Sequence, residues 1–299
     1  VESGMVDCAL ALGFEQMVPG ALGAVFTDRP NPMKRMFKEM VNVQGIDKKA
    51  PGAAQYFGGA GREYAEEFGT KDETFAKISE KARIHAANNP YAVFKELLTV
   101  EQIMDSPHIY GPLTRYQCCP PTWGAAAAVI CSADFAKKHG LNNAISIKGQ
   151  SMTTDFASTL DDHSMRKLVG VDMAKQAAKE VYEQAGVGPE DVQVVELHDC
   201  FTANELLSYE SLGLTPEGTA EKFIWDGDNT YGGKIVTNPS GGLLSKGHPL
   251  GATGLAQCTE LVWQLRGDSG PRQVEGARHA LQHNLGLGGA CVVTMYSND

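Results

Sequence analysis

Apolar and polar positions alternate in blocks of strand length and helix length along the second half of the chain. Short apolar runs predict strands over residues 144–147, 192–197 and 290–297. Apolar side chains that recur every three or four positions predict helices over residues 171–186, 203–213 and 253–267. The inner face of the last helix is predicted to carry Leu255, Cys258, Leu261, Val262 and Leu265. Since strands and helices alternate, we expect a layered α/β fold.

The first half of the chain has a less regular pattern. Residues 6–12 and 124–133 are runs of apolar and small residues, which predict two buried strands. The segment 18–115 between them contains scattered Pro, Gly and charged residues, so we interpret it as an inserted loop region with short helical pieces. One such piece is predicted over residues 74–88, and Thr99 with Gln102 predicts a capping box at the start of another.

Composition and charge narrow the function classes. The chain of 299 residues has a net charge of −10 and no basic stripe, which argues against a nucleic-acid partner. No apolar run approaches the roughly 18 residues of a membrane span. The seven cysteines are odd in number and irregularly spaced, without a CxxC pair, so we expect neither a disulfide framework nor a structural zinc site. A reducing compartment fits this cysteine usage.

The sequence HDCF places His198, Asp199 and Cys200 between a predicted strand and a predicted helix. Thr202 and Glu205 have capping-box spacing, so the helix is expected to begin near residue 203. A thiol just before a helix N-terminus has a lowered pKa, which predicts an accessible thiolate at Cys200. The alternative is structural: Cys200 is a small buried hydrophobic residue and His198 a satisfied polar group.

Two glycine-rich loops follow. The loop 238–254, NPSGGLLSKGHPLGATG, surrounds His248 with five glycines, and Thr253 is placed to cap the next helix. A histidine held in such a loop suits general base catalysis or hydrogen bonding to an oxyanion. The alternative interpretation is a structural turn. The loop 283–290, HNLGLGGA, is a further glycine turn of the kind that brings backbone amides against a substrate.

Together these motifs resemble the thiolase superfamily. GHPLGATG followed by an amphipathic helix is similar to the thiolase histidine loop, and HDCF stands where many thiolases carry N-E-A-F. This replacement, with NPSGG (238–242) and ALQHNLG (280–286), resembles the sterol carrier protein X branch of the family. QCCPPTWGAAAA (117–128) and LALGFEQM (10–17) extend the resemblance over essentially the whole chain.

The resemblance implies a thiolase fold, in which two similar βαβαβ halves stack in five αβαβα layers. The N-terminal half would be incomplete here, with residues 1–17 and 116–143 as its remainder. Residues 18–115 would be the inserted loop region, and residues 144–299 the C-terminal half.

The resemblance also implies residue roles. His248 would take the proton from the nucleophilic cysteine, His198 would contribute to the oxyanion hole, and Cys200 would act as acid and base. No metal is implied, and coenzyme A would be a substrate without any permanently bound cofactor. The implied substrate and CoA contacts are Asn238, Ser245, Gly247, Gly286 and Gly288.

The implied reaction is CoA-dependent cleavage of a medium-chain, long-chain or branched 3-oxoacyl-CoA to a shortened acyl-CoA plus acetyl-CoA or propionyl-CoA. A homodimer in the peroxisome would be typical of the family, with the mitochondrion or the cytoplasm as alternatives. A lipid-transfer domain could be fused downstream.

One departure from the family affects this interpretation. The family's acylated cysteine lies about twenty residues upstream of the strand that matches LALGFE, so we expect it outside this chain. Two further hypotheses therefore stay open: a non-catalytic acyl-CoA-binding or interaction protein on a thiolase fold, and a cysteine hydrolase that uses Cys200 and His198.

Overall fold

The computed structural model of the protein describes residues 1–18, 20, 23 and 26–299. Its strands are β1 (Cys8–Gln16), β2 (His108–Tyr110), β3 (Leu113–Thr114), β4 (Trp123–Cys131), β5 (Ser146–Thr153), β6 (Val194–Glu196), β7 (Val236–Thr237), β8 (His279–Gly286) and β9 (Ala290–Ser297). Its α-helices are α1 (Lys34–Gln44), α2 (Gly52–Phe68), α3 (Asp72–Ala87), α4 (Val100–Met104), α5 (Ala133–Lys138), α6 (Ser158–Asp161), α7 (Met165–Leu168), α8 (Val171–Ala185), α9 (Thr202–Ser211), α10 (Ala220–Trp225) and α11 (Thr253–Arg266).

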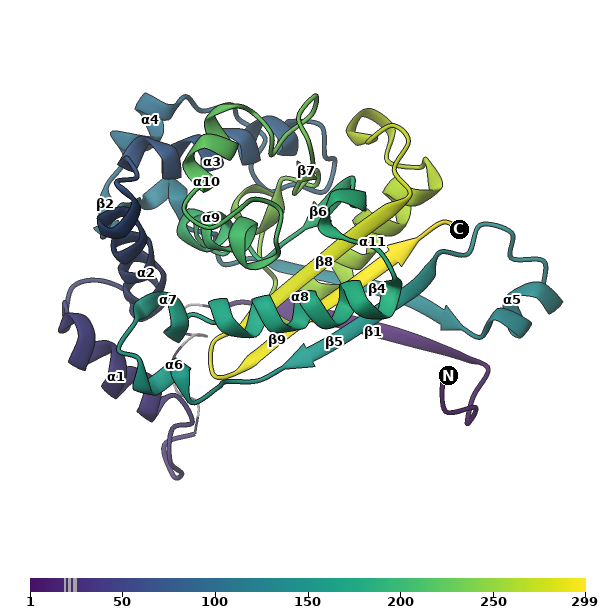
Figure 1. The fold of residues 1–299 in the computed structure, drawn as a ribbon, viewed down its shortest axis with the longest axis horizontal. Helices are drawn as coiled ribbons and strands as arrows, with labels where there is room; N and C mark the ends of the chain where they lie inside the picture. Colours follow the sequence, from purple (N-terminus) through teal and green to yellow (C-terminus); the bar gives the residue numbers. More distant parts are fainter. Residues whose placement is uncertain (19, 21–22, 24–25) are drawn as a thin grey trace.

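A five-stranded mixed sheet forms the centre of the molecule, with strand order β5-β9-β8-β6-β7 (Figure 1). Strands β6, β7 and β8 are parallel, whereas β9 is antiparallel to both β5 and β8. Helix α8 packs on β5 and β9, and α11 packs on β6 and β8. The carboxyl end of β6 leads directly into the HDCF sequence, so the parallel part of this sheet positions the candidate site.

Strands β1 and β4 form a second, two-stranded antiparallel sheet, which also packs on α11. Four layers therefore follow one another: α8, the five-stranded sheet, α11, and the sheet of β1 and β4. Gly13 in β1 permits the close packing, because a Cβ atom there would lie 2.3 Å from the carbonyl oxygen of Gly251 at the start of α11. The layered α/β fold predicted from the sequence is confirmed.

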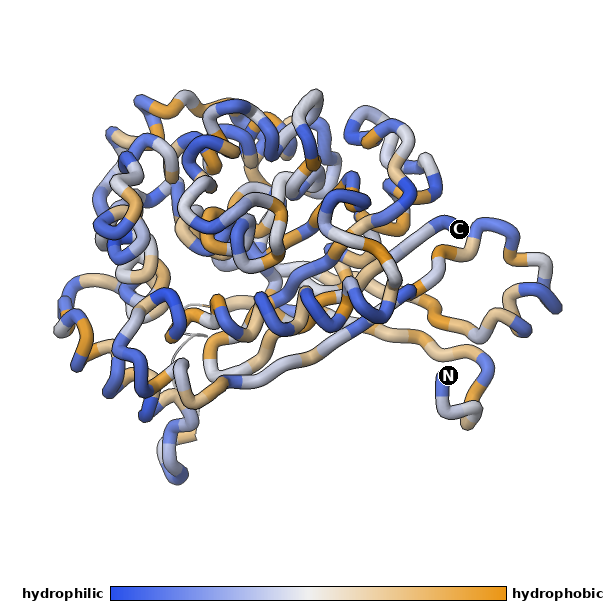
Figure 2. Tube along the Cα trace, viewed as in Figure 1, coloured by the Kyte–Doolittle hydropathy of each residue, from blue (hydrophilic) through white to orange (hydrophobic). Residues whose placement is uncertain are grey.

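The prediction that the strands near residues 6–12 and 124–133 are buried is wrong for one face of their sheet. On that face Leu10, Leu12 and Phe14 are 67%, 62% and 71% exposed, and their cross-strand neighbourhood includes the exposed Val129 and Trp123. Figure 2 shows hydrophobic colours along much of β1. In the described part of the chain this face is not covered by the fifth layer that the resemblance implies.

The segment 18–115 is more helical than the predicted loop region. Residues 19, 21–22 and 24–25 lie outside the described residues; the remainder contains α1 to α4, of which α2 and α3 have 17 and 16 residues. The predicted helix over 74–88 is confirmed as α3, and the capping box of Thr99 and Gln102 is confirmed at α4. Helices α2 and α3 pack on α9, so this segment supports the helix that follows HDCF.

Within residues 144–299 the predicted elements are largely confirmed. Strand β9 has the predicted bounds, and α8 ends at Gly186 in the left-handed conformation. The strand predicted at 144–147 begins two residues later and continues to Thr153. The inner face of α11 differs from the prediction, because the side chains that α11 buries, besides Leu261 and Leu265, are polar: Thr253, Gln257, Glu260 and Gln264.

A buried ion pair joins the inserted segment to the C-terminal half. Lys81 of α3 contacts the Glu205 carboxylate of α9, and both side chains are almost completely buried. The Lys81 Nζ also donates to the Thr237 hydroxyl at 2.6 Å and to the Tyr209 hydroxyl at 3.2 Å. These contacts satisfy a charge that would otherwise be very unfavourable in the core.

Replacement of Lys81 tests this dependence. Lys81→Met should leave the Glu205 carboxylate buried without a cation and lower the free energy of unfolding by about 3–5 kcal/mol in urea titrations. Lys77→Met is the matched control on the same helix, because Lys77 pairs with Glu80 at a more exposed position. It should cost less than about 1 kcal/mol. Equal losses in the two variants would contradict the role assigned to Lys81.

The apolar face of β1 gives a second prediction. Exposed apolar patches promote association, so residues 1–299 by themselves should self-associate and bind an apolar dye. Leu12→Lys with Phe14→Lys should reduce both effects, as measured by light scattering and dye fluorescence. A monodisperse wild-type chain without dye binding would contradict this expectation.

Candidate active site

The HDCF sequence forms the turn between β6 and α9. His198, Asp199 and Cys200 are buried in it, and helix α9 begins at Thr202. The predicted capping box of Thr202 and Glu205 is wrong: Phe201 is the N-cap residue and makes no side-chain cap, and the Thr202 hydroxyl has no partner. Glu205 instead faces inward to Lys81, because the buried cation competes successfully for its carboxylate.

The His248 loop lies beside this turn. It begins with a π-helical turn at Gly242–Lys246 and continues through Gly247, whose φ of 119° favours glycine. His248 forms a parallel bridge with Pro121, so the CCPPT segment lines the loop. A Cβ atom on Gly247 would lie 2.9 Å from the Thr122 side chain, which shows how closely the two segments approach.

Thr253 fixes the tautomer of His248. The predicted cap at Thr253 is wrong, since Ala252 is the N-cap residue of α11 and makes no side-chain cap. The Thr253 hydroxyl donates to the Pro249 carbonyl at 3.0 Å, so it accepts from His248 Nδ1 at 2.7 Å. Nδ1 therefore carries the proton, and Nε2 keeps the lone pair that a general base needs.

The rings of His198 and His248 meet edge to face, with centroids 5.1 Å apart and an interplanar angle of 88°. Burial lowers the pKa of His248 to about 4, with a smaller contribution from Lys246. Burial, His248 and His283 lower the pKa of His198 well below its usual range. Both rings are therefore neutral near pH 7. The Nδ1 atom of His198 is buried and has no partner in the described part of the chain.

The third glycine loop reaches the same place through β8. The Asn284 side chain opposes this lowering of the His198 pKa, and the His198 N–H donates to His283 Nδ1 at 3.5 Å. Asn284 Nδ2 also donates to Gln257 Oε1 of α11 at 3.0 Å. The predicted loop 283–290 is therefore partly strand: residues 283–286 complete β8 and include Asn284, and residue 290 begins β9.

Cys200 has different neighbours from the two histidines. Its carbonyl accepts a hydrogen bond from the Cys119 N–H at 2.9 Å, and Cys118 forms an antiparallel bridge with Phe201. Burial, followed by the charges of Cys119 and Asp199, raises the pKa of the Cys200 thiol well above its usual range. The predicted thiolate is therefore not favoured in this structure, because desolvation outweighs the helix N-terminus.

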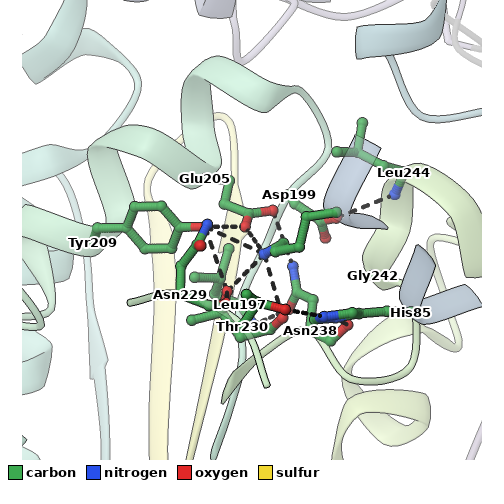
Figure 3. A network of polar contacts seen from close by, with 12 residues as sticks. His85, Leu197, Asp199, Glu205, Tyr209, Asn229, Thr230, Asn238, Gly242 and Leu244 are labelled. Atoms are coloured by element: carbon green, nitrogen blue, oxygen red, sulfur yellow. Dashed lines mark hydrogen bonds and ion pairs between the residues drawn. The ribbon is translucent and has the colours of Figure 1, made fainter. Parts of the chain in front are cut away.

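Asp199 connects the HDCF turn to the loop that carries His248. Its carboxylate accepts backbone hydrogen bonds from Leu243 at 2.7 Å and from Leu244 at 3.3 Å, both in the π-helical turn before His248. Figure 3 shows the contact with Leu244. Burial and the neighbouring Glu205 raise the pKa of Asp199. The second residue of HDCF, Asp199, therefore fixes the position of the loop that carries His248.

Asn238 belongs to the network behind the site. It has a φ of 52°, and its side chain accepts from the Leu197 N–H at 2.8 Å and donates to Glu205 at 3.3 Å. Its carbonyl accepts from His85 Nδ1 at 3.0 Å (Figure 3). These contacts engage the side chain of Asn238 inside the protein, and its substrate contact stays a prediction.

The other predicted contacts have distinct environments. Ser245 is fully buried, and its hydroxyl has no partner among the residues that the structure describes. Gly247 lies between that serine and His248, while Gly286 ends β8 on the surface. Gly288 has a φ of 99° in the turn between β8 and β9, near Met33. The structure thus brings together His198, His248 and Gly247, whereas Gly286 and Gly288 lie toward the outer end of β8.

Asp199, Thr253 and Asn284 were not assigned site roles from the sequence. Thr253 follows His248 by five residues across a proline turn, and this spacing was the available signal. Asn284 gave no comparable signal, because its position depends on the pairing of β8 with β6.

No cluster of three or more His, Cys, Asp or Glu side chains suited to a metal ion occurs among the described residues. Across the same residues, helices of the length and hydropathy needed to cross a bilayer are absent.

The chain is similar to known proteins along most of its length. Residues 155–296 match the family "Thiolase C-terminal domain-like". The chain is 56% identical over 297 residues to "Sterol carrier protein 2" of Oryctolagus cuniculus. This alignment covers 99% of this chain and 54% of the relative. It is 36% identical to "Acetyl-CoA acetyltransferase" of Methanothermobacter thermautotrophicus, covering 99% of this chain and 74% of the relative.

A solved structure supports the fold. The "Ltp2-ChsH2(DUF35) aldolase" superposes with a TM-score of 0.81 at 22% identity, covering 99% of this chain and 74% of that one. The chain spans about half the length of the sterol carrier protein relative, which is 54% covered. The family match covers residues 155–296, and the relative with 36% identity is covered over 74% of its length. Together with the matching fold, these similarities show that the chain belongs to the thiolase family of acyltransferases.

Proposed function

We propose that the full-length protein carrying this chain cleaves 3-oxoacyl-CoA with CoA, giving a shortened acyl-CoA plus acetyl-CoA or propionyl-CoA. The substrates would have medium, long or branched acyl chains. The observation that carries the proposal is the meeting of two neutral histidines, His198 and His248, in the HDCF and GHPLGATG loops. CoA acts as a substrate, and no permanently bound cofactor is required.

The first proposed role is that of His248. Its Nε2 atom removes the proton from a nucleophilic cysteine thiol, and the resulting thiolate attacks the 3-oxo carbon of the substrate. The bond between C2 and C3 then breaks, leaving an acyl group on the cysteine and an electron pair on the enolate of acetyl-CoA or propionyl-CoA. The His198 ring, which is neutral, stabilises the oxyanion through a hydrogen bond.

The second proposed role is that of Cys200. A buried thiol with a raised pKa is protonated near neutral pH, so Cys200 is ready to donate its proton to the enolate carbon. The Cys200 thiolate then takes the proton of the incoming CoA thiol, and CoA attacks the acyl group. This transfer releases the shortened acyl-CoA and expels the nucleophilic cysteine as a thiolate. The thiolate takes its proton back from His248, so both cysteines and the histidine return to their starting states.

The acylated cysteine is proposed to be none of the seven in this chain. Burial raises the pKa of Cys118 to about 12 and that of Cys291 to about 12, and it also raises the pKa of Cys119 and Cys258. Cys8 and Cys131 lie opposite each other on β1 and β4. Further parts of the proposal are a homodimer, a fused lipid-transfer domain and a peroxisomal location, with the mitochondrion or the cytoplasm as alternatives.

A second candidate function is a non-catalytic acyl-CoA-binding or interaction protein. The raised pKa of Cys200 favours it over the cysteine hydrolase, which needs a thiolate activated by His198. An assay of the full-length protein with a 3-oxoacyl-CoA plus CoA separates the candidates. Turnover supports thiolysis, whereas CoA binding without turnover supports the binding protein.

Thr253→Val tests the tautomer of His248. The valine removes the acceptor of the Nδ1 proton, so kcat of the full-length protein should fall by a factor on the order of 10² with little change in KM. Nitrogen NMR at pH 7 should show the proton on Nδ1 in the wild type and a mixture in the variant. Thr259→Val is the control, because Thr259 bonds only within α11. A wild-type proton on Nε2 would contradict the assignment.

Cys200→Ala tests the proton transfer. Turnover of the full-length protein should fall by a factor on the order of 10² or more, because the proton donor is lost. Acylation should persist, and mass spectrometry should locate the acyl group outside residues 1–299. Cys291→Ala, at a second buried cysteine, should keep most of the activity. An acyl group found on Cys200 would show that the roles have been assigned wrongly.

A further inference from the structure

Three basic side chains are deeply buried among the described residues: Lys81, Arg83 and Arg272. Two of them have buried carboxylate partners. Lys81 pairs with Glu205, and Arg272 forms a two-pronged contact with Glu260 at 3.1 and 2.9 Å. Arg83 is as buried as Lys81, at 5% exposure, but its guanidinium has no ion pair among the described residues. The Glu96 carboxylate acts on its charge from beyond ion-pair distance.

Two aromatic rings hold the Arg83 guanidinium. Its Cζ atom lies 4.4 Å from the centre of the Phe94 ring and 5.6 Å from that of Tyr116. The Tyr116 carbonyl is in turn fixed by the Ser79 hydroxyl at 2.5 Å, one turn before Arg83 on α3. Stacking engages the faces of a guanidinium and leaves its N–H edge free, and its nitrogens are not among the fully buried polar atoms without a partner.

The position of Arg83 connects it to the candidate active site. The Phe94 N–H donates to the Ser245 carbonyl at 3.0 Å, and the Val93 N–H donates to the Lys246 carbonyl at 3.2 Å. These residues immediately precede Gly247 and His248. Lys246 is a second cation without an ion pair among the described residues, and its charge acts on His248.

The charge balance makes an unpaired buried cation unusual here. The chain has 36 acidic and 26 basic residues, so carboxylates are plentiful. Burial of a cation without a counter-ion is unfavourable, and an exposed N–H edge of arginine matches the paired oxygens of a phosphate. A CoA ester carries phosphates at the end remote from its thioester.

We propose that Arg83 binds a phosphate of the CoA ester whose thioester end lies at His248. The inference rests on the proposed function, since it takes its ligand from that reaction. The anion accepts hydrogen bonds from the N–H edge of the guanidinium. The Phe94 and Tyr116 rings fix the plane of the guanidinium and therefore the plane in which the phosphate is bound. Arg83 is then a substrate-binding residue that selects CoA esters over the same thioesters without phosphate.

Calorimetric titration of the full-length protein tests the proposal with three probes: CoA, dephospho-CoA, which lacks the 3′-phosphate, and pantetheine, which has no phosphate. Arg83→Gln should weaken CoA binding about 10- to 100-fold, as loss of a charge-assisted hydrogen-bonded pair predicts. Pantetheine binding should not change. A loss for CoA alone identifies the 3′-phosphate, and a loss for both nucleotides identifies the diphosphate.

Arg62→Gln is the matched control. The Arg62 guanidinium also lies on an aromatic ring, that of Tyr110 at 5.6 Å, but it has Gln44 and Glu66 as partners. This variant should bind all three probes as the wild type does. Arg83→Lys keeps the charge but loses the planar set of N–H donors, so it should weaken CoA binding by an intermediate factor. This variant replaces Arg83→Gln if circular dichroism shows that Arg83→Gln is unfolded.

The results separate this proposal from the proposed function. Unchanged CoA binding in folded Arg83 variants, or equal weakening of CoA and pantetheine, overturns the role of Arg83 and leaves thiolysis intact. A folded wild type that binds no CoA overturns both proposals. CoA binding that depends on Arg83 without thiolytic turnover supports this inference and counts against the reaction.

Discussion

The buried ammonium of Lys81 is the interaction on which the rest of the site depends. Taking this charge out of water is strongly unfavourable unless several acceptors surround it. Glu205 and Tyr209 of α9 and Thr237 of β7 supply these acceptors. Glu205 then holds the Asn238 amide, and Asn238 in turn fixes the backbone at Leu197, just before HDCF. One buried charge thereby orders the carboxyl ends of two neighbouring strands.

Desolvation decides the protonation states of this site. A helix N-terminus stabilises a thiolate by a modest amount, whereas removal of a charged group from water can shift a pKa by several units. His198, His248 and Cys200 are therefore all neutral in the structure before a ligand binds. His248 is a neutral base with a free lone pair, and Cys200 is a neutral thiol that carries a proton. Such groups can accept and donate a proton without creating an isolated buried charge.

The sequence allowed the layered α/β fold, α8, β9 and the two histidine loops to be predicted, because these features follow from local periodicity and from glycine spacing. The capping roles of Thr202 and Thr253 were predicted wrongly, because local capping competes with tertiary partners that local spacing does not reveal. The same limit applies to Asn284 and Arg83. Each depends on segments far away in the chain, such as β6 beside β8 or Phe94 beside Ser245.

The close contact of Gly13 with Gly251 has a consequence for biosynthesis. These residues are separated by most of the chain, yet β1 and β4 rest on α11, which follows His248. During translation the two strands therefore emerge long before the helix that covers their inner face. Contacts between such distant segments form slowly, and an uncovered pair of apolar strands is prone to aggregation in the meantime. The nascent chain should thus need a chaperone until α11 has left the ribosome.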